Sequence, residues 1–256
     1  MTVASPLPEI TPDTTENALL DGRVRLRQPI RGYRAGMDAA LLAAAVEAKP
    51  GERIIEAGCG AGAVLTQIAA RCPGVSLTGI ELDPAASRLA RQNAALNEIE
   101  ARMEIMDADI ASGFRTLALP TFDWAISNPP FFDDEAALRP PAPEKRGAWM
   151  AVDGLAVWTD FLVRAVHDGG RIVMIHRADR LADILHLLGQ RCGSITIQPV
   201  HPFSDTPAKR VVVRAIRAGK APLSLLPPLI LHQRLDGKHS AWAEAILRGR
   251  AVLSMS

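Results

Sequence analysis

The chain has 256 residues, of which 48% are hydrophobic and 22% are charged, and its formal net charge is only +1. This length and composition fit one large globular domain with a small appendage. The balanced charge excludes a global field that attracts nucleic acid, so any such site must be a local patch. The three cysteines lie far apart, which excludes a disulfide framework and a zinc site and predicts a reducing compartment.

The first twenty residues contain three acidic residues and no apolar core, so they do not resemble a secretory signal peptide. They are rich in Pro and Thr, and we expect a loose arm there. Elsewhere, no apolar stretch approaches the ~20 residues of a membrane span. We therefore expect a cytoplasmic protein with no membrane partner.

An arginine-rich segment follows the arm. Arg23, Arg25 and Arg27 alternate with apolar residues, and a strand of this period places three guanidinium groups on one face. With Arg31 and Arg34, five arginines fall within twelve residues. Two interpretations are open: an edge strand protected by its charge, and a surface that contacts phosphates.

Strands and helices alternate through the middle of the chain. Apolar runs predict strands at 53–55, 75–80, 103–106, 122–126 and 171–175, and helical periodicity predicts helices at 38–48, 64–71, 84–96, 158–166 and 181–188. Alternation at about 25 residues per unit predicts an α/β fold with a doubly wound, mostly parallel, seven-stranded sheet and right-handed crossovers.

The end of the chain follows a different pattern. The runs at 194–198 and 210–216 have no helix between them, so we expect the last strand to be antiparallel. Residues 220–256 are interrupted by prolines, and we expect them to pack on the rim with a helix from about Ser240.

Polar and glycine residues follow the predicted strands at the edge where open α/β sheets bind ligands. The first strand runs into Glu56-Ala57-Gly58-Cys59-Gly60-Ala61-Gly62, where glycines permit a close approach and a helix N-terminus offers free N–H groups. The second ends in Glu81-Leu82-Asp83, placed to accept both hydroxyls of a ribose. The third ends in Asp107-Ala108-Asp109, where an acid can bind the exocyclic amine of adenine.

The glycine loop also satisfies a loose dinucleotide fingerprint, so a nicotinamide enzyme stays an alternative. Against it, Glu56 would repel a pyrophosphate but attract an ammonium group, and no further phosphate site is visible. An adenosine with a cationic centre and an amino-acid tail fits better, which indicates S-adenosylmethionine. Each acid taken alone could instead cap a helix, and Asp83 and Asp109 are the better candidates for that role.

The fourth strand runs into Ser127-Asn128-Pro129-Pro130-Phe131-Phe132. Taken alone, this stretch could be a strand that ends in a stiff turn. A long loop follows between Phe132 and Trp158, with basic residues at Arg139, Lys145 and Arg146. Loops of this length are usually functional or disordered, and we favour a flap that faces the substrate.

Together, the glycine loop, the acidic second strand end and the Asn-Pro-Pro-Phe turn resemble class I methyltransferases that act on a planar nitrogen. The bacterial tRNA(Val) adenine-N6-methyltransferase family is the most similar. The likeness to it rests on Gln28-x-x-x-Gly32-Tyr33-Arg34-x-x-x-Asp38-x-x-Leu41-Leu42, the Asn-Pro-Pro-Phe turn, and Pro227-Pro228-Leu229-Ile230-Leu231-His232 with Asp236-Gly237. The same turn occurs in rRNA guanine-N2 and protein glutamine methyltransferases, which stay alternatives, as do a small-molecule methyltransferase and a non-catalytic RNA-binding factor.

The resemblance implies a Rossmann-like enzyme that uses S-adenosylmethionine, acts on tRNA and needs no metal. The Asn128 carboxamide oxygen and the Pro129 carbonyl would accept the two N–H groups of the amine and orient its lone pair for in-line attack. Pro130 would stiffen the turn, and Phe131 would stack on the base, worth roughly 1–3 kcal/mol. Gly32 to Asp38 would close over the methionine end of the cofactor.

This reading assigns residues 1–35 to the arm and arginine-rich strand, 36–219 to the catalytic domain and 220–256 to a tail. The expected cofactor-binding residues are Glu56, Gly58, Gly60, Gly62, Glu81, Leu82, Asp107, Ala108 and Asn128. The expected RNA-binding residues are Arg23, Arg25, Arg27, Arg31, Arg139, Lys145 and Arg146.

Overall fold

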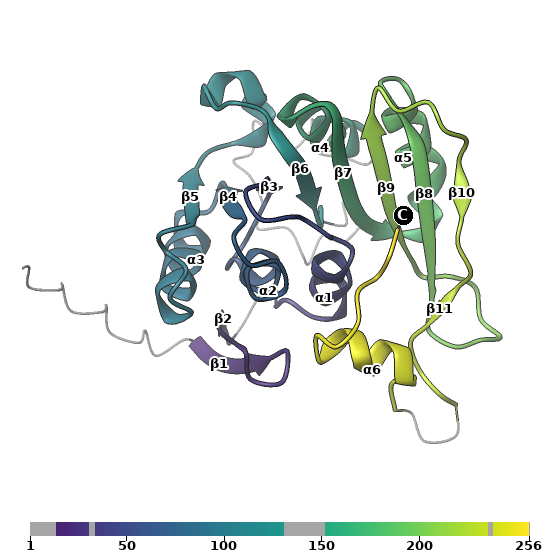
Figure 1. Cartoon of the computed structure of the whole chain (residues 1–256), viewed down its shortest axis with the longest axis horizontal. Coiled ribbons are helices and arrows are strands. Elements are labelled where there is room, and N and C mark those ends of the chain that lie inside the picture. Colours follow the sequence, from purple (N-terminus) through teal and green to yellow (C-terminus); the bar gives the residue numbers. More distant parts are fainter. Residues whose placement is uncertain (1–13, 31–33, 131–151, 235–237, 256) are drawn as a thin grey trace, which may run out of the picture.

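The structure is a computed structural model that describes residues 14–30, 34–130, 152–234 and 238–255. Its central sheet has the strand order β10-β8-β9-β7-β6-β3-β4-β5, with β11 also beside β8 (Figure 1). The strands are β3 (Arg53–Ala57), β4 (Ser76–Glu81), β5 (Met103–Asp107), β6 (Phe122–Ser127), β7 (Val166–Arg177), β8 (Cys192–His201), β9 (Arg210–Arg217), β10 (Ser224–Leu225) and β11 (Leu229–Ile230).

The sheet is mostly parallel, as predicted. β3 to β7 pair in parallel, whereas β9 is antiparallel to both of its neighbours, β7 and β8. β10 and β11 extend the predicted seven strands at the β8 edge. Because β9 is antiparallel to both neighbours, β8 runs in the same direction as β7, and β11 runs parallel to β8.

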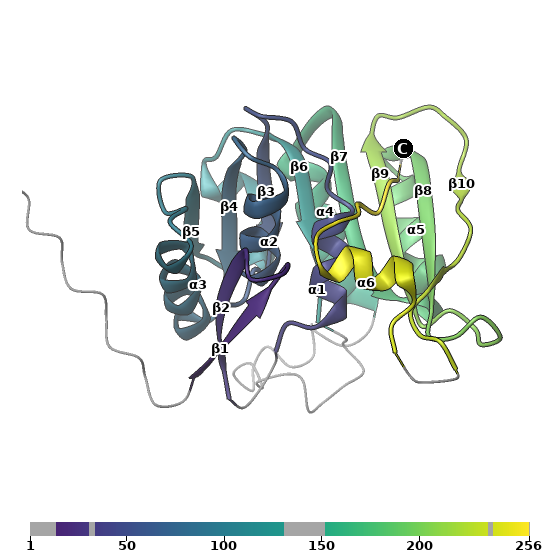
Figure 2. The same cartoon turned by 60° about the horizontal axis from the view of Figure 1, so that its bottom comes forward.

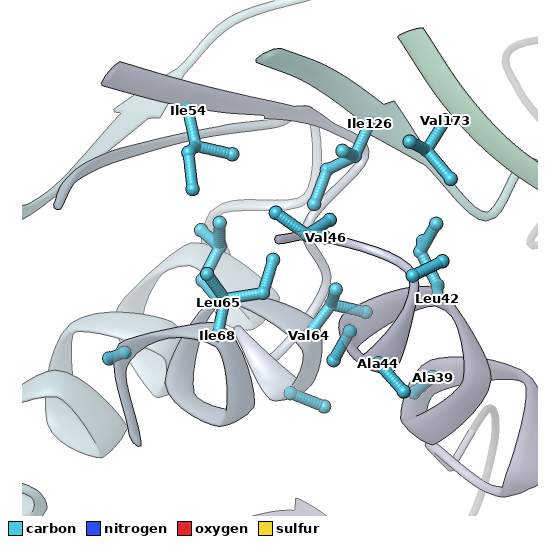
Figure 3. Close-up of a cluster of buried hydrophobic side chains, with 14 of the residues drawn as sticks. Ala39, Leu42, Ala44, Val46, Ile54, Val64, Leu65, Ile68, Ile126 and Val173 are labelled. Atoms are coloured by element: carbon cyan, nitrogen blue, oxygen red, sulfur yellow. The ribbon is translucent and has the colours of Figure 1, made fainter. Parts of the chain in front are cut away.

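The helices cover both faces of the sheet. They are α1 (Met37–Ala44), α2 (Ala63–Arg71), α3 (Pro84–Leu96), α4 (Val152–Ala165), α5 (Leu181–Gly189) and α6 (Ala241–Leu247). On one face, Ile54, Ile126 and Val173 of the sheet lie over α1 and α2 (Figure 3). On the other, the sheet packs against α4 and α5. Because the central strands are buried on both faces, their sequences are continuous apolar runs and do not alternate between apolar and polar residues.

The N-terminal hairpin corrects one expectation. Residues 14–19 were expected in the loose arm, but Thr14–Leu19 forms β1, which pairs antiparallel with β2 (Val24–Pro29). The turn between the strands buries Leu20, and Glu16 forms ion pairs with Arg25 and Arg27, so the polar strand is fixed by its partner. Figure 2 shows this hairpin outside the helix layer, where it packs against α2 and α3.

Two further boundaries differ from the sequence prediction. α4 begins at Val152, inside the stretch that was expected to be a loop up to Trp158. β7 begins at Val166 and includes the glycine pair that was expected to precede it. The rest of the expected flap, residues 131–151, lies outside the described residues.

Residues after β11 contact the sheet domain through α6 and the segment that follows it. α6 starts after Ser240, whose hydroxyl accepts a hydrogen bond from the Ala243 N–H at 3.1 Å. Beyond α6, Leu253 and Met255 are buried, and the Leu253 N–H donates to the Ala44 carbonyl at 2.8 Å. In the part of the chain that the structure describes, we find no helix with the length and apolar character needed to cross a membrane.

Candidate functional site

Four neighbouring strands bring the predicted site residues to one edge of the sheet. β5, β4, β3 and β6 lie side by side in that order and are parallel, so their carboxyl ends meet. Asp107 pairs with Glu81 in the register of β5 and β4, and Ser127 pairs with Ala57 in the register of β6 and β3. Gly58 and Asn128, the next residues, therefore leave the sheet together.

Hydrogen bonds to neighbouring strand ends fix the glycine loop. The N–H groups of Gly58 and Cys59 donate to the carbonyl of Ile80 at 2.8 and 3.0 Å. The Gly60 N–H donates to Oε2 of Glu81 at 2.8 Å. Gly58, Gly60 and Gly62 have φ values of +68°, +54° and +78°, a region that favours glycine.

Side chains from other elements press against two of these glycines. A Cβ on Gly58 would lie 2.3 Å from Cη2 of Trp158, on α4. A Cβ on Gly62 would lie 2.8 Å from Cε of Met103. A Cβ on Gly60 would meet no described atom within 4 Å, so the loop is packed at both ends and open in the middle. Trp158 is a site residue that the sequence analysis missed.

Glu56 is a buried carboxyl group just before the glycine loop. Its Oε2 atom has no hydrogen-bond partner among the described residues. Burial, and then the negative charge of Glu81, raise the pKa of Glu56 well above its usual range. A buried acceptor without a partner costs free energy unless a ligand satisfies it, and an ammonium group is the matching donor.

Glu81 links the second strand end to the glycine loop. Besides the bond from Gly60, its Oε1 accepts the Asp83 N–H at 2.8 Å. Each carboxylate oxygen keeps a second lone pair for a hydroxyl. The Leu82 side chain beside it is 55% exposed, which gives an apolar surface at a ligand-binding edge.

Asp107 lies at the third strand end and is half-exposed. Arg91 donates to its Oδ1 at 2.9 Å. The nearby Ser87 hydroxyl and then the Arg91 guanidinium lower the pKa of the Asp107 carboxyl. The Ala108 N–H donates to the Glu81 carbonyl at 2.9 Å, so it continues the ladder between the strands.

The two acids named as capping candidates are caps. Oδ1 of Asp83 accepts the Ala85 N–H at 2.9 Å at the start of α3. Oδ1 of Asp109 accepts the Ala111 N–H at 2.9 Å at the start of the short 3-10 helix Ile110–Ser112. Neither residue was in the expected cofactor-binding set.

The Asn-Pro-Pro turn is anchored at its base. Ser127 is fully buried, and its hydroxyl donates to the Ala57 carbonyl at 3.0 Å. Asn128 is half-buried, Pro129 is buried and Pro130 is half-buried. The other predicted member of the turn, Phe131, lies outside the described residues, as do Arg31, Arg139, Lys145 and Arg146.

The described arginines of the predicted RNA surface have partners within the chain. Arg23 donates to the carbonyls of Leu20, Arg248 and Gly249 at 3.1, 3.3 and 2.9 Å, so it joins the hairpin to the tail. Arg25 and Arg27 both contact Glu16, and their side chains are 56% and 17% exposed.

The donors and spaces at this edge fit S-adenosylmethionine. Glu56 has a buried oxygen that can accept a hydrogen bond from an ammonium group. The space beside Gly60 holds no described atom within 4 Å of a built Cβ. Glu81 has carboxylate oxygens that can accept hydroxyl groups, next to the exposed apolar side chain of Leu82. This arrangement can hold an amino-acid tail, a ribose and a base in a row, next to the Asn128 turn.

Comparison with known proteins agrees with this geometry. Residues 34–140 match the family model described as methyltransferase small domain. A tRNA1(Val) (adenine(37)-N6)-methyltransferase from Porphyromonas gingivalis is 30% identical over 189 residues, which span 70% of this chain and 72% of that relative. The relative of the same name from Dickeya chrysanthemi is 28% identical over 75% of this chain and 76% of its own length. The alignment to the Yersinia enterocolitica relative, at 35% identity, spans 42% of that protein.

Solved structures share the fold. A structure from Agrobacterium tumefaciens, described as a predicted O-methyltransferase, is 27% identical with a TM-score of 0.71, and the match covers 85% of this chain and 98% of that one. A structure from Listeria monocytogenes, described as a putative class I S-adenosylmethionine-dependent methyltransferase, has a TM-score of 0.56 at 17% identity. That match covers 83% of this chain and 68% of that one. The chain is therefore an S-adenosylmethionine-dependent methyltransferase, and it belongs to the family of the tRNA1(Val) (adenine(37)-N6)-methyltransferases.

Proposed function

We propose that this enzyme transfers a methyl group from S-adenosylmethionine to the N6 amine of an adenine in tRNA. The observation that carries the proposal is the register of β3 and β6, which places the Asn128 turn beside the glycine loop. The names of the Porphyromonas and Dickeya relatives supply the choice of adenine and of tRNA.

The cofactor is assigned to the edge formed by β3, β4 and β5. Glu56 would bind the ammonium group, and the backbone of Gly58, Gly60 and Gly62 would line the amino-acid tail. Glu81 would accept the ribose hydroxyls. The adenine would lie on Leu82 and reach the Asp107 carboxylate and the backbone at Ala108. When bound, S-adenosylmethionine supplies the electrophilic methyl carbon.

The turn itself would prepare the acceptor amine. An exocyclic amine is a weak nucleophile because its lone pair is delocalised into the ring. The Asn128 carboxamide oxygen and the Pro129 carbonyl would accept its two N–H groups, which localises the lone pair and directs it toward the methyl carbon. Pro130 would hold the turn rigid and Phe131 would stack on the base. No strong base is needed, because the proton can leave after transfer.

The RNA would bind around this edge. We divide the chain into an N-terminal arm and strand (1–35), a catalytic domain (36–219) and a tail (220–256). Arg25 has a side chain that is 56% exposed and would contact a phosphate directly. Arg23 and Arg27 would add positive potential while they hold the hairpin in place. Arg31, Arg139, Lys145 and Arg146 complete the proposed RNA-binding set.

The proposal is tested by the identity of the product. The enzyme is incubated with isotope-labelled S-adenosylmethionine and unmodified tRNA, with rRNA in a separate reaction. The RNA is then digested to nucleosides for mass spectrometry. We expect labelled N6-methyladenosine from tRNA. Labelled N2-methylguanosine from rRNA would overturn the choice of base and RNA. No label in either RNA, with cofactor binding intact, would overturn the proposal in favour of a protein or small-molecule acceptor or a non-catalytic RNA-binding factor.

A further inference from the structure

We propose that a cleft between the hairpin, α1 and the tail binds an unpaired nucleobase of the RNA, next to the base that is methylated. This inference rests on the proposed function and extends it to residues 200–247. The cleft has a volume of about 450 Å³. That is within the ~300–1,000 Å³ range of small-molecule sites. Its lining includes Leu19 of the hairpin, Gly36 and Met37 at the start of α1, Leu247 of α6, and the tail residues His232 and His239.

The cleft is adjacent to the edge that carries the methyltransferase site. β8 and β11 run in the direction of β7 and β6, so the chain after His201 and after Ile230 leaves the sheet at the edge where Asn128 lies. Ala35, Gly36 and Met37 of the lining lie within the Gly32–Asp38 segment that was expected to close over the methionine end of the cofactor, and α1 begins at Met37. Figure 2 shows α6 and the start of α1 beside each other near this edge.

Two imidazole rings give the cleft an aromatic wall. The rings of His232 and His239 are stacked, with centroids 4.9 Å apart and planes at 27°. Phe203 lies beside this pair, with its centroid 5.8 Å from that of His232 and the two ring planes tilted by 45°. The His239 Nδ1 atom is buried and has no hydrogen-bond partner among the described residues. The rings of this wall could stack on the face of a base, and the unsatisfied Nδ1 atom could form a hydrogen bond with its edge.

Two further residues lie on segments that contribute to the cleft: Arg234 follows His232 by two residues, and Trp242 lies on α6, which supplies Leu247. Arg234 lies over the Phe203 ring, with Cζ 4.9 Å from its centroid, and a bidentate contact with Asp205 holds it there. Trp242, on α6, has a side chain that is 53% exposed. Aromatic faces interleaved with basic groups are the typical surface for single-stranded nucleic acid. In a chain of net charge +1, RNA affinity must come from local surfaces, and this one would add stacking contacts to the basic residues assigned above.

The test compares tRNA affinity and kinetics in three variants. Trp242→Ala removes the exposed ring, and His232→Ala with His239→Ala removes the stacked wall. Leu225→Ala is the matched control, because this side chain is 65% exposed on β10, outside the cleft. The dissociation constant of unmodified tRNA is measured for each, with the KM for tRNA, kcat, S-adenosylmethionine affinity and melting temperature.

We expect tRNA affinity to fall about 5- to 100-fold in the cleft variants, from the loss of base stacking. The KM for tRNA should rise by the same factor in these variants. Their S-adenosylmethionine affinity should stay within twofold of the wild type and their melting temperature within 2 °C. The Leu225→Ala variant should match the wild type in tRNA affinity within twofold. Unchanged tRNA affinity in the variant that lacks both His232 and His239 rings would overturn the inference whatever Trp242→Ala does, as would a wild type that binds no RNA. Failure of the proposed function is a separate result: the wild type binds tRNA but leaves no label in its adenosine.

Discussion

Asn93 of α3 and Ala61 of the glycine loop are joined by a hydrogen bond of 2.9 Å from the Asn93 side-chain Nδ2 to the Ala61 carbonyl. The same carboxamide binds both backbone groups of Arg27, at 2.8 and 2.9 Å. One buried side chain therefore couples the arginine-rich strand to the loop that we assign to the cofactor. Asn97, one turn later on α3, binds both backbone groups of Arg25 but does not contact the loop.

Asn93→Ala should weaken both folding and cofactor binding. It leaves three backbone groups without their partner, at a cost of about 1–3 kcal/mol. For a protein of this size, that lowers the melting temperature by about 2–12 °C. Asn97→Ala is the control that loses hydrogen bonds to the strand and to the Asn93 carbonyl of its own helix, so it should lower the melting temperature but keep S-adenosylmethionine affinity. Equal cofactor affinity in the two variants, measured by calorimetry, would show that Asn93 does not position the loop.

Glu56→Gln should separate stability from cofactor affinity. Because burial and Glu81 raise the pKa of Glu56, its stabilising contribution is complete below the unfolded-state pKa and is lost as pH rises through the folded-state pKa. The neutral amide escapes that penalty, so the ligand-free variant should melt higher than the wild type at neutral pH.

The same substitution should weaken S-adenosylmethionine binding by roughly tenfold to a hundredfold, because a charged hydrogen bond is lost. Wild-type affinity should increase as pH rises and Glu56 ionises, and the Gln variant should lose this part of the pH dependence. Calorimetry across a pH series measures both, and a variant with wild-type affinity would exclude the ammonium contact.

Gly58→Ala should damage the cofactor loop by a clash as well as by strain. The positive φ alone costs about 1–2 kcal/mol for a residue with a Cβ. The new Cβ would also meet Trp158 at 2.3 Å, and such overpacking adds about 1–3 kcal/mol. Gly51→Ala has a φ of +87° with no described atom within 4 Å of its Cβ, so it reports the strain of a positive φ without a clash. Thermal unfolding should show the larger loss for Gly58→Ala; equal losses would mean that Trp158 yields without cost.

His176 should make the protein less stable in acid. Its burial, and then the positive charges of Arg180, Arg177 and Arg210, lower its pKa to about 4. The neutral ring is favoured in the folded state, so stability falls as pH drops from the unfolded pKa near 6.5 through about 4, by about 3 kcal/mol. Denaturant unfolding of His176→Leu should lack this loss. A variant with the wild-type pH profile would place the acid sensitivity elsewhere.

The strand ends could be predicted from sequence because their signals are local. α3 has the predicted bounds, since Asp83 caps it and Pro84 opens it. Glu56, Glu81, Asp107 and Asn128 each follow an apolar strand, and parallel pairing then brings the ends of four strands together without further information.

The supporting contacts could not be predicted, because they join distant parts of the chain. Trp158 meets Gly58 from α4, and no spacing pattern relates the two. Asn93 is fully buried although an asparagine in an amphipathic helix usually faces solvent. β1 was missed because Thr14–Leu19 is polar and is held by its partner strand and by Glu16.

Asn128→Ala tests the central claim most directly, in a single-turnover assay of methyl transfer to unmodified tRNA with cofactor affinity measured in parallel. If the carboxamide activates the amine, the rate of transfer should fall by at least about 10²–10³-fold, the scale for loss of one preorganised hydrogen-bonding group at a reacting centre. S-adenosylmethionine affinity should stay within about threefold, because the contacts at Glu56, Glu81 and the glycine loop are intact. A variant that transfers the methyl group at the wild-type rate would contradict this account of the site.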